Sequence, residues 1–359
     1  MTTKFFRNVL LILCIVITVA CGLPESQDVT PTAPPTEEVT TGAPPTEIAI
    51  QHEVIPIDLP GQESGQAADF DSSIIPGSDY FIGGDRFTYG RFERPFNANT
   101  MDIYFPEIDI NHTMVLQDDI WVYGIIVMND LSADQLQDKK YGVELDTTLN
   151  GKGDFLILTT LPTTQDWAVD GVQIYADQNQ DVGGNLPYQT DENITPGDGF
   201  EAQIFNSGQG DDPDAAWVRL SPNFENSIEL AIKKSAIGNP AAFMINMWAG
   251  TKALDPALFD LNDRFTHEEA GAADEGLEFY YPIKALAEID NSCRMAVGFQ
   301  PTGKEAGICA TVQQAAPEIP GTSSTPGRPT IILHFPCIPV SCPADSYWDD
   351  ASCGCKPVR

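Results

Sequence analysis

Basic residues are scarce in this sequence. Lys and Arg total 19 against 52 Asp and Glu, and the 359 residues include only four His. The formal net charge of −33 argues against nucleic acid as a partner, because phosphate binding is built from clustered Lys and Arg. The same sign disfavours electrostatic docking on anionic lipid. We therefore expect no nucleic-acid partner.

Short catalytic motifs are also missing. No Ser or Cys lies in a G-x-S-x-G turn, and no H-E-x-x-H occurs. A glycosidase needs two facing carboxylates, but among 52 acidic residues the sequence cannot select a pair. We expect a non-catalytic protein with no catalytic residue and no nucleotide or haem cofactor. An extracytoplasmic glycan-acting hydrolase and a purely structural envelope protein are the alternatives.

The apolar run near the N-terminus is too short to span a bilayer. Val9–Ala20 is twelve residues long, whereas a transmembrane helix needs about 20. Lys4 and Arg7 precede the run as a basic region. This arrangement is typical of a secretory signal peptide, which we assign to residues 1–20.

Thr18-Val19-Ala20-Cys21-Gly22 ends the apolar run and resembles the lipobox of bacterial lipoproteins. The resemblance implies that Cys21 is lipidated and becomes the mature N-terminus. It also implies an extracytoplasmic location, with the lipid bilayer as a partner through this anchor. Ordinary secretory cleavage near the same point is the alternative.

A stalk follows the anchor. No Lys or Arg occurs between Arg7 and Arg86, and residues 21–70 are dominated by Pro, Thr and Glu without a hydrophobic period. Such a segment cannot bury enough apolar surface to offset its ordering entropy. We expect a disordered, extended spacer.

Residues 71–315 predict an all-β domain. Apolar runs and alternating segments recur at short spacing, separated by Gly- and Asp-rich turns. The expected strands include 101–110, 119–128, 141–146, 155–160, 171–175, 217–220, 228–232 and 243–249. Many short strands of this kind indicate a sandwich or jelly roll. Trp121 and Trp248 lie in apolar runs and are expected in the core.

Two of these strands carry a resemblance. Asp118-Asp119-Ile120-Trp121-Val122-Tyr123 is followed by Tyr141-Gly-Val-Glu-Leu-Asp146, a Gly-Asp turn and another apolar strand. This order is similar to that in the DOMON and family-9 carbohydrate-binding sandwiches. The resemblance implies binding of a ligand, a sugar or haem, rather than hydrolysis. Haem-binding members use axial Met and His, and no such pair can be assigned here.

Asp177, Asn179 and Asp181 form a candidate calcium site. The D-x-N-x-D spacing places three oxygen-bearing side chains on one side of a tight loop, and Ca²⁺ takes six to eight oxygen ligands. Val182 and Tyr188 occupy the positions where an EF-hand has Gly and Glu, so the loop is not an EF-hand. The alternative is an ordinary turn, since Asp and Asn also bond the local backbone.

Trp167 is the candidate ligand-binding aromatic. It lies in a polar stretch, Thr163–Asp170, and could present a platform on which a sugar ring stacks. The alternative is a Trp that closes the end of the core. The resulting interpretation is a surface-tethered, non-catalytic protein that binds an extracellular ligand such as a glycan.

Six cysteines remain after Cys14 and Cys21. An even number in an exported protein implies disulfides. We expect Cys293 and Cys309 to pair. The other four, Cys337, Cys342, Cys353 and Cys355, lie in a C-terminal module of residues 330–359, after a linker of residues 316–329.

The sequence from Cys342 to Cys355 resembles the C-P-x-x-x-x-[WF]-D-x-x-x-C-x-C units of extracellular cysteine-rich repeats. Cys353 and Cys355 are too close in sequence to bond each other comfortably, so each is expected to reach Cys337 or Cys342. A Cys₄ zinc site is the alternative.

Overall fold

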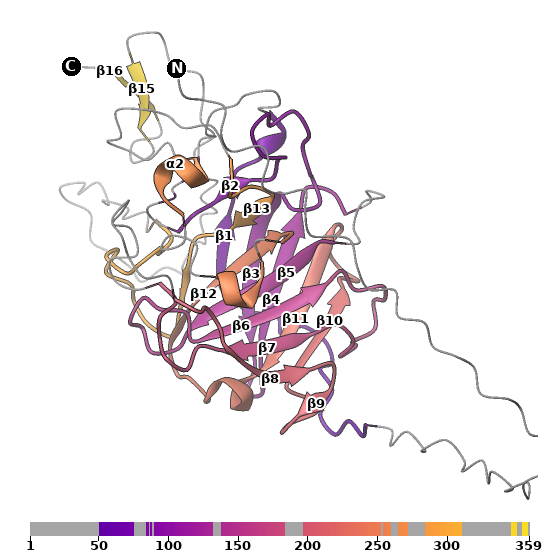
Figure 1. Ribbon diagram of the computed structural model, residues 1–359. Helices are drawn as coiled ribbons and strands as arrows, with labels where there is room; N and C mark the ends of the chain where they lie inside the picture. Colours follow the sequence, from indigo (N-terminus) through magenta and orange to yellow (C-terminus); the bar gives the residue numbers. More distant parts are fainter. Residues whose placement is uncertain are drawn as a thin grey trace, which may run out of the picture. The chain divides into compact units, whose positions relative to one another are not determined.

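The computed structural model describes residues 50–74, 84–85, 87, 90–131, 138–183, 197–252, 254–259, 265–271, 284–310, 346–349 and 354–357. Cys21, Cys337, Cys342 and Cys353 lie outside these residues, as do the predicted signal peptide and the linker. Cys355 is described as a residue of strand β16. Two antiparallel β-sheets dominate the described chain (Figure 1).

The first sheet has five strands. Their spatial order is β1 (Glu63–Ala68), β3 (Ile110–Gln117), β4 (Trp121–Met128), β11 (Ser227–Lys233) and β10 (Ala216–Leu220). Every neighbouring pair is antiparallel. Because Ile110 pairs with Met128, the start of β3 and the end of β4 lie at one end of the sheet.

The second sheet has nine strands. Eight follow in the order β2 (Glu93–Arg94), β13 (Ile289–Asn291), β12 (Phe243–Gly250), β5 (Lys140–Asp146), β6 (Phe155–Thr160), β7 (Gln173–Ala176), β8 (Ala202–Asn206) and β9 (Gln209–Gly210). The ninth, β14 (Met295–Val297), also pairs with β12.

Short elements complete the described chain. Three 3₁₀ turns span Ser72–Ile74, Lys234–Ile237 and Pro256–Leu258, and α2 spans His267–Ala270. A separate hairpin pairs β15 (Ser346–Asp349) with β16 (Gly354–Pro357). No helix among the described residues is long and apolar enough to cross a membrane.

The all-β sandwich expected from the sequence is confirmed. The predicted strands from residue 119 onward each fall on an observed one. The expected strand over 101–110 is wrong. Pro106 interrupts it, and Ile108 N donates to Phe105 O (3.1 Å) in a turn, so the regular strand begins only at Ile110.

β4 contributes to two cores because both of its faces are covered. Val122, Ile126 and Met128 face the core between the sheets, where they meet Tyr141 and Val143 of the second sheet. Trp121, Tyr123, Ile125 and Val127 face a cluster on the outer side of the first sheet. All eight residues of β4 are buried, which explains its continuous apolar sequence. Trp121 and Trp248 are both buried, as expected.

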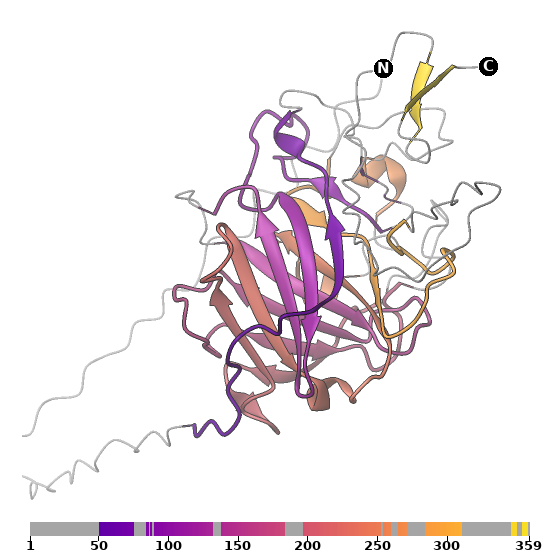
Figure 2. The same ribbon diagram turned by 180° about the vertical axis from the view of Figure 1, so that it is seen from behind.

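The outer side of the first sheet is covered by the chain before β1. Val54 and Leu59 pack on the cluster of Trp121 and Tyr123. Figure 2 shows this indigo segment running along the five-stranded sheet. The sandwich therefore begins before residue 70, where the composition suggests that the stalk ends. The segment is rich in Pro and Glu overall, but its few apolar residues, such as Val54 and Leu59, cover the outer face of the first sheet.

Asp214 fixes this segment. Its Oδ1 is bonded to His52 Nδ1 (2.7 Å), and its Oδ2 accepts from the backbone N–H groups of Glu53 and Val54 (both 2.8 Å). We call these four residues the N-terminal clip. The three bonds join positions about 160 residues apart in sequence, so the clip ties the chain to the loop before β10.

Arg94 in β2 organises the loops over the second sheet. It is fully buried and binds Asp85 through Nε (2.7 Å) and Nη2 (3.1 Å). Its guanidinium also donates to the carbonyl oxygens of Ala270, Gly271 and Leu286. The planar group stacks on Phe87 and Phe92, so one side chain satisfies several loops at once.

Cys293 and Cys309 form a disulfide, as the sequence predicts. They are 16 residues apart, and both side chains pack against the main core. In the chain-entropy account, a crosslink closing a loop of this size stabilises the fold by about 3 kcal/mol. The bridge fixes the segment after β14 on the sandwich.

The double variant Cys293→Ala, Cys309→Ala should fold but unfold about 6–12 °C below the wild type, because the unfolded chain regains the freedom that the crosslink removes. Thermal unfolding followed by circular dichroism under non-reducing conditions measures the shift. An unchanged midpoint would contradict a stabilising role for this bridge.

Candidate functional site

Four acidic residues converge at the end of the sandwich where β3 starts. Asp69 directly follows β1 and Asp109 directly precedes β3, so both flank strands of the first sheet. Glu93 lies in β2 and Asp290 in β13, directly opposite each other in the antiparallel ladder of the second sheet. Glu93, Asp109 and Asp290 are buried. We call Asp69, Glu93, Asp109 and Asp290 the carboxylate cluster.

Hydrogen bonds hold one oxygen of each carboxyl group. Asp290 Oδ2 accepts from Ile110 N (2.6 Å), a bond that crosses from the second sheet to the first. Asp69 Oδ1 accepts from Phe70 N (3.0 Å). Glu93 Oε1 accepts from the Ser72 hydroxyl. These bonds orient the carboxyl groups.

Asp109 Oδ2 has three donors. Ser72 N donates at 3.2 Å, Asn129 Nδ2 at 2.8 Å, and the Tyr104 hydroxyl also donates to it. Such a carboxylate has a fixed direction, because rotating it would break all three bonds.

Three oxygens of the cluster have no hydrogen-bond donor among the described residues. They are Asp69 Oδ2, Asp109 Oδ1 and Asp290 Oδ1, and all three are shielded from solvent. Asp69, Glu93 and Asp290 each offer an oxygen that lies within 4.8 Å of those of the other two. A buried polar atom without a partner costs about 1–3 kcal/mol, and more when it is charged. The arrangement therefore calls for a proton or a cation.

Burial dominates the acid–base behaviour of the cluster. It raises the pKa of Asp69 to about 8 and that of Asp109 to about 7, because the ionised form loses its hydration. Burial and then the neighbouring carboxylates raise the pKa values of Glu93 and Asp290 well above their usual range. Arg91 opposes the change at Asp69 by lowering its pKa.

The predicted calcium loop is folded by its own side chains. Asp177 Oδ1 accepts from Gln180 N (2.6 Å), and its Oδ2 accepts from Val182 N (3.0 Å). Asn179 Oδ1 accepts from Asp181 N (3.0 Å). The same residues thus serve as turn formers, the alternative that the sequence left open. Calcium at this loop stays a prediction.

Asp181 has a buried oxygen, Oδ1, without a hydrogen-bond partner in the described part of the chain, while its Oδ2 accepts from Asp198 N (3.0 Å). The loop also touches the neighbouring acidic turn, because Gln180 Nε2 donates to Asp154 Oδ1 (3.0 Å). Burial raises the pKa of Asp177.

Trp167 closes the outer cluster of the first sheet. Its side chain is half-buried, and its Nε1 donates to Ile57 O (2.9 Å). The Arg219 guanidinium carbon lies 4.2 Å from the ring centroid, and the Tyr123 ring packs at 6.1 Å. Sugar binding at Trp167 stays a prediction, but its polar edge and one face already have protein partners.

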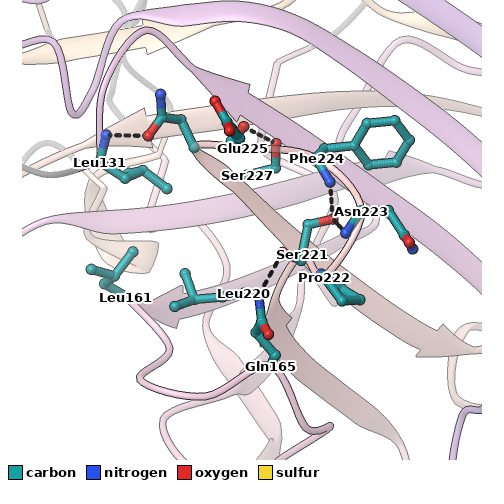
Figure 3. Close-up of a pocket in the computed structure, with 11 residues that line it drawn as sticks. Leu131, Leu161, Gln165, Leu220, Ser221, Pro222, Asn223, Phe224, Glu225 and Ser227 are labelled. Carbon is teal, nitrogen blue, oxygen red and sulfur yellow. Dashed lines mark hydrogen bonds between the residues drawn. The ribbon is translucent and has the colours of Figure 1, made fainter.

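A pocket of about 600 Å³ lies near the end of the sandwich that holds the carboxylate cluster. It is formed between the loop after β6 and the β10–β11 turn (Figure 3). We call it the Phe224 pocket. The residues that line it include Leu131, Leu161, Gln165, Asn223, Phe224 and Asn226. Figure 3 shows the leucines on one side, with Asn223 and the Phe224 ring on the other.

Ser221 supports the turn that forms the pocket rim. Its hydroxyl accepts from Asn223 N (3.1 Å) and Phe224 N (2.9 Å), and donates to buried Glu229 (2.6 Å). The turn leaves the Phe224 side chain 39% exposed, although it is a large aromatic residue. Phe224 and Asn223 also line a second pocket of about 220 Å³, together with Leu59.

Asn129 connects the pocket to the carboxylate cluster. Its Nδ2 donates to Asp109 Oδ2, and its carbonyl oxygen accepts from Asn226 Nδ2 (3.5 Å). Asn226 Oδ1 in turn accepts from Leu131 N (3.3 Å). The sequence offered no signal for this assembly, because its members come from turns far apart in the chain.

Comparison with models of protein families, with curated proteins and with solved structures finds no match to this chain. The assignment of function therefore depends on the chemistry of its own residues.

The folded protein should become less stable as the pH rises from about 4 to about 8 when divalent cations are chelated. Unfolded carboxyl groups titrate near pH 4, so in this window the folded cluster holds protons that the unfolded chain has released. Each such proton lowers the free energy of unfolding by about 1.4 kcal/mol per pH unit. Urea unfolding at pH 5 and pH 8 with chelator measures this change.

Asp290→Asn is the matched variant, because the amide keeps an acceptor for Ile110 N but removes one titrating group. Its loss of stability between pH 5 and pH 8 should be smaller than that of the wild type. Equal losses in the two proteins would refute the assignment of the effect to this cluster.

Proposed function

We propose that this chain is an exported, surface-tethered and non-catalytic binding protein whose ligand is a hydroxyl-rich molecule such as a glycan. The Phe224 pocket is the observation that carries the proposal. Its volume of about 600 Å³ falls within the usual range for small-ligand sites, about 300–1,000 Å³.

The chemistry of the rim supports a neutral polar ligand. Gln165, Asn223 and Asn226 carry amides that both donate and accept hydrogen bonds, which suits hydroxyl groups. Leu131 and the exposed Phe224 provide apolar surface for the C–H face of a sugar ring. Glu225 is the one ionisable residue among the described residues that line the pocket, and the net charge of −33 disfavours anionic ligands.

Support for the tether comes from the N-terminal sequence. A short basic region, an apolar run and the lipobox-like Cys21 precede an acidic, Pro-rich stretch. A lipid at the mature N-terminus would hold the sandwich at the cell surface, with the stretch as a spacer. A pocket on a tethered domain suits capture of extracellular material.

Phe224→Ala should weaken glycan binding about tenfold, because an aromatic contact contributes about 1 kcal/mol or more beyond its area. Glycan-array screening followed by titration of the best oligosaccharide tests this. Ile204→Ala, which truncates another exposed apolar residue on β8, should leave affinity unchanged. Failure of every arrayed glycan to bind would overturn the proposal, and turnover of a bound polysaccharide would favour the hydrolase alternative.

Cys21→Ser should release the protein from membranes into the medium, because the acyl chains would have no attachment point. Cell fractionation with immunoblotting measures the distribution. Cys14→Ser, which changes a cysteine inside the expected signal peptide, should leave the protein anchored. Absence of metabolic palmitate labelling in the wild type would disprove lipidation.

A further inference from the structure

The unsatisfied oxygens of the carboxylate cluster point to a ligand. Asp109 and Asp290 are fully buried, and each has one oxygen without a donor among the described residues. The other oxygen of each is already fixed by N–H or O–H donors. Each carboxylate thus has one oxygen oriented by hydrogen bonds and one oxygen available to a ligand. Metal-binding carboxylates are commonly oriented by surrounding hydrogen bonds in the same way.

The composition of the cluster restricts the metal. Carboxylates supply only hard oxygen donors, which suit calcium, magnesium or manganese rather than zinc or copper. Among the residues that the structure describes, no His or Cys belongs to the group that lies within 4.8 Å. A hard divalent cation is therefore the class of ligand that fits.

Coordination geometry favours calcium among these cations. The oxygens of Asp69, Glu93 and Asp290 lie within 4.8 Å of one another, close enough for one ion to contact all three. Magnesium demands near-ideal octahedral geometry, whereas calcium takes six to eight oxygens in flexible arrangements. Calcium also accepts irregular geometry, which suits ligands drawn from two sheets.

We propose that the carboxylate cluster binds one calcium ion between the two sheets, through Asp69, Glu93 and Asp290. This site is distinct from the Asp177 loop and does not depend on the ligand of the Phe224 pocket. Two positive charges from the ion would offset part of the charge of the carboxylate cluster. Arg91 provides a further positive charge that acts on Asp69.

The alternative occupant of the cluster is a set of shared protons. Two carboxyl groups that share a proton would also satisfy otherwise unpaired oxygens. Measured calcium content distinguishes the calcium site from the shared protons, because a cluster neutralised by protons would retain no calcium after dialysis. The measurements are made at pH 8.5, where protons compete least with the ion.

The experiment uses the full chain, purified in detergent, stripped with chelator and then dialysed against micromolar calcium. Elemental analysis should find about one calcium per chain. Addition of 1 mM CaCl₂ to the stripped protein should raise its melting temperature by about 5 °C or more, because the ion binds only the folded state. The same concentration of MgCl₂ should give a much smaller shift.

Asp290→Asn and Glu93→Gln should each abolish the calcium-dependent shift, and the two variants guard against a failure of either one to fold. The double variant Asp177→Asn, Asp181→Asn is the matched control and should keep the shift. Calcium content of the control variant gives a second readout, because that variant keeps the carboxylate cluster and lacks the carboxylates of the Asp177 loop.

Several outcomes would overturn the proposal. These are a stripped protein that takes up no calcium, an equal shift with magnesium, or a shift that disappears in the Asp177–Asp181 control while Asp290→Asn keeps it. Each of these outcomes is measured without a glycan, so a failure of this proposal is distinguishable from a failure of the glycan-binding proposal.

Discussion

The bond between Ile110 N and Asp290 Oδ2 joins the two sheets at the end where the carboxylate cluster lies. Asp290 is an acidic residue in the interior of a strand, placed opposite another acid, Glu93. Like charges at opposed positions destabilise a ladder unless something neutralises them. The stability of this end of the sandwich therefore depends on how these charges are compensated, because Asp290 also holds the first residue of β3.

Neutralisation at this end has consequences beyond the cluster. Asp109 holds Asn129, and Asn129 holds Asn226 at the rim of the Phe224 pocket. A rigid cluster would therefore restrain the β10–β11 turn through the hydrogen bonds of Asn129. The polar network is satisfied only in part by the described protein atoms, and such networks are sensitive to whatever completes them.

The strongly apolar strands could be predicted from the sequence. Residues 119–128 and 243–249 are rich in β-branched and aromatic residues, and both fall on buried strands, β4 and β12. Cys293 and Cys309 were paired by counting cysteines. The strands can be predicted because the pattern of neighbouring residues is sufficient to identify them. The disulfide can be predicted because few cysteines are available to pair.

The carboxylate cluster could not be predicted in that way. Asp69 and Asp290 are separated by more than 200 positions, and nothing near either residue distinguishes it from the other 50 acids. Only the pairing of β2 with β13 brings Glu93 opposite Asp290. The Asp177 loop was conspicuous because its oxygens follow one another in sequence, whereas the cluster is assembled by tertiary contacts.

The N-terminal clip determines how the domain responds to pulling. Tension applied through the chain before residue 50 reaches Asp214 before it reaches β1. The load is shared by three hydrogen bonds, to His52, Glu53 and Val54, that must break together. An edge strand pulled from its end would otherwise peel from its neighbour one bond at a time. The clip thus bears load before β1 does when the chain is pulled from its N-terminal side.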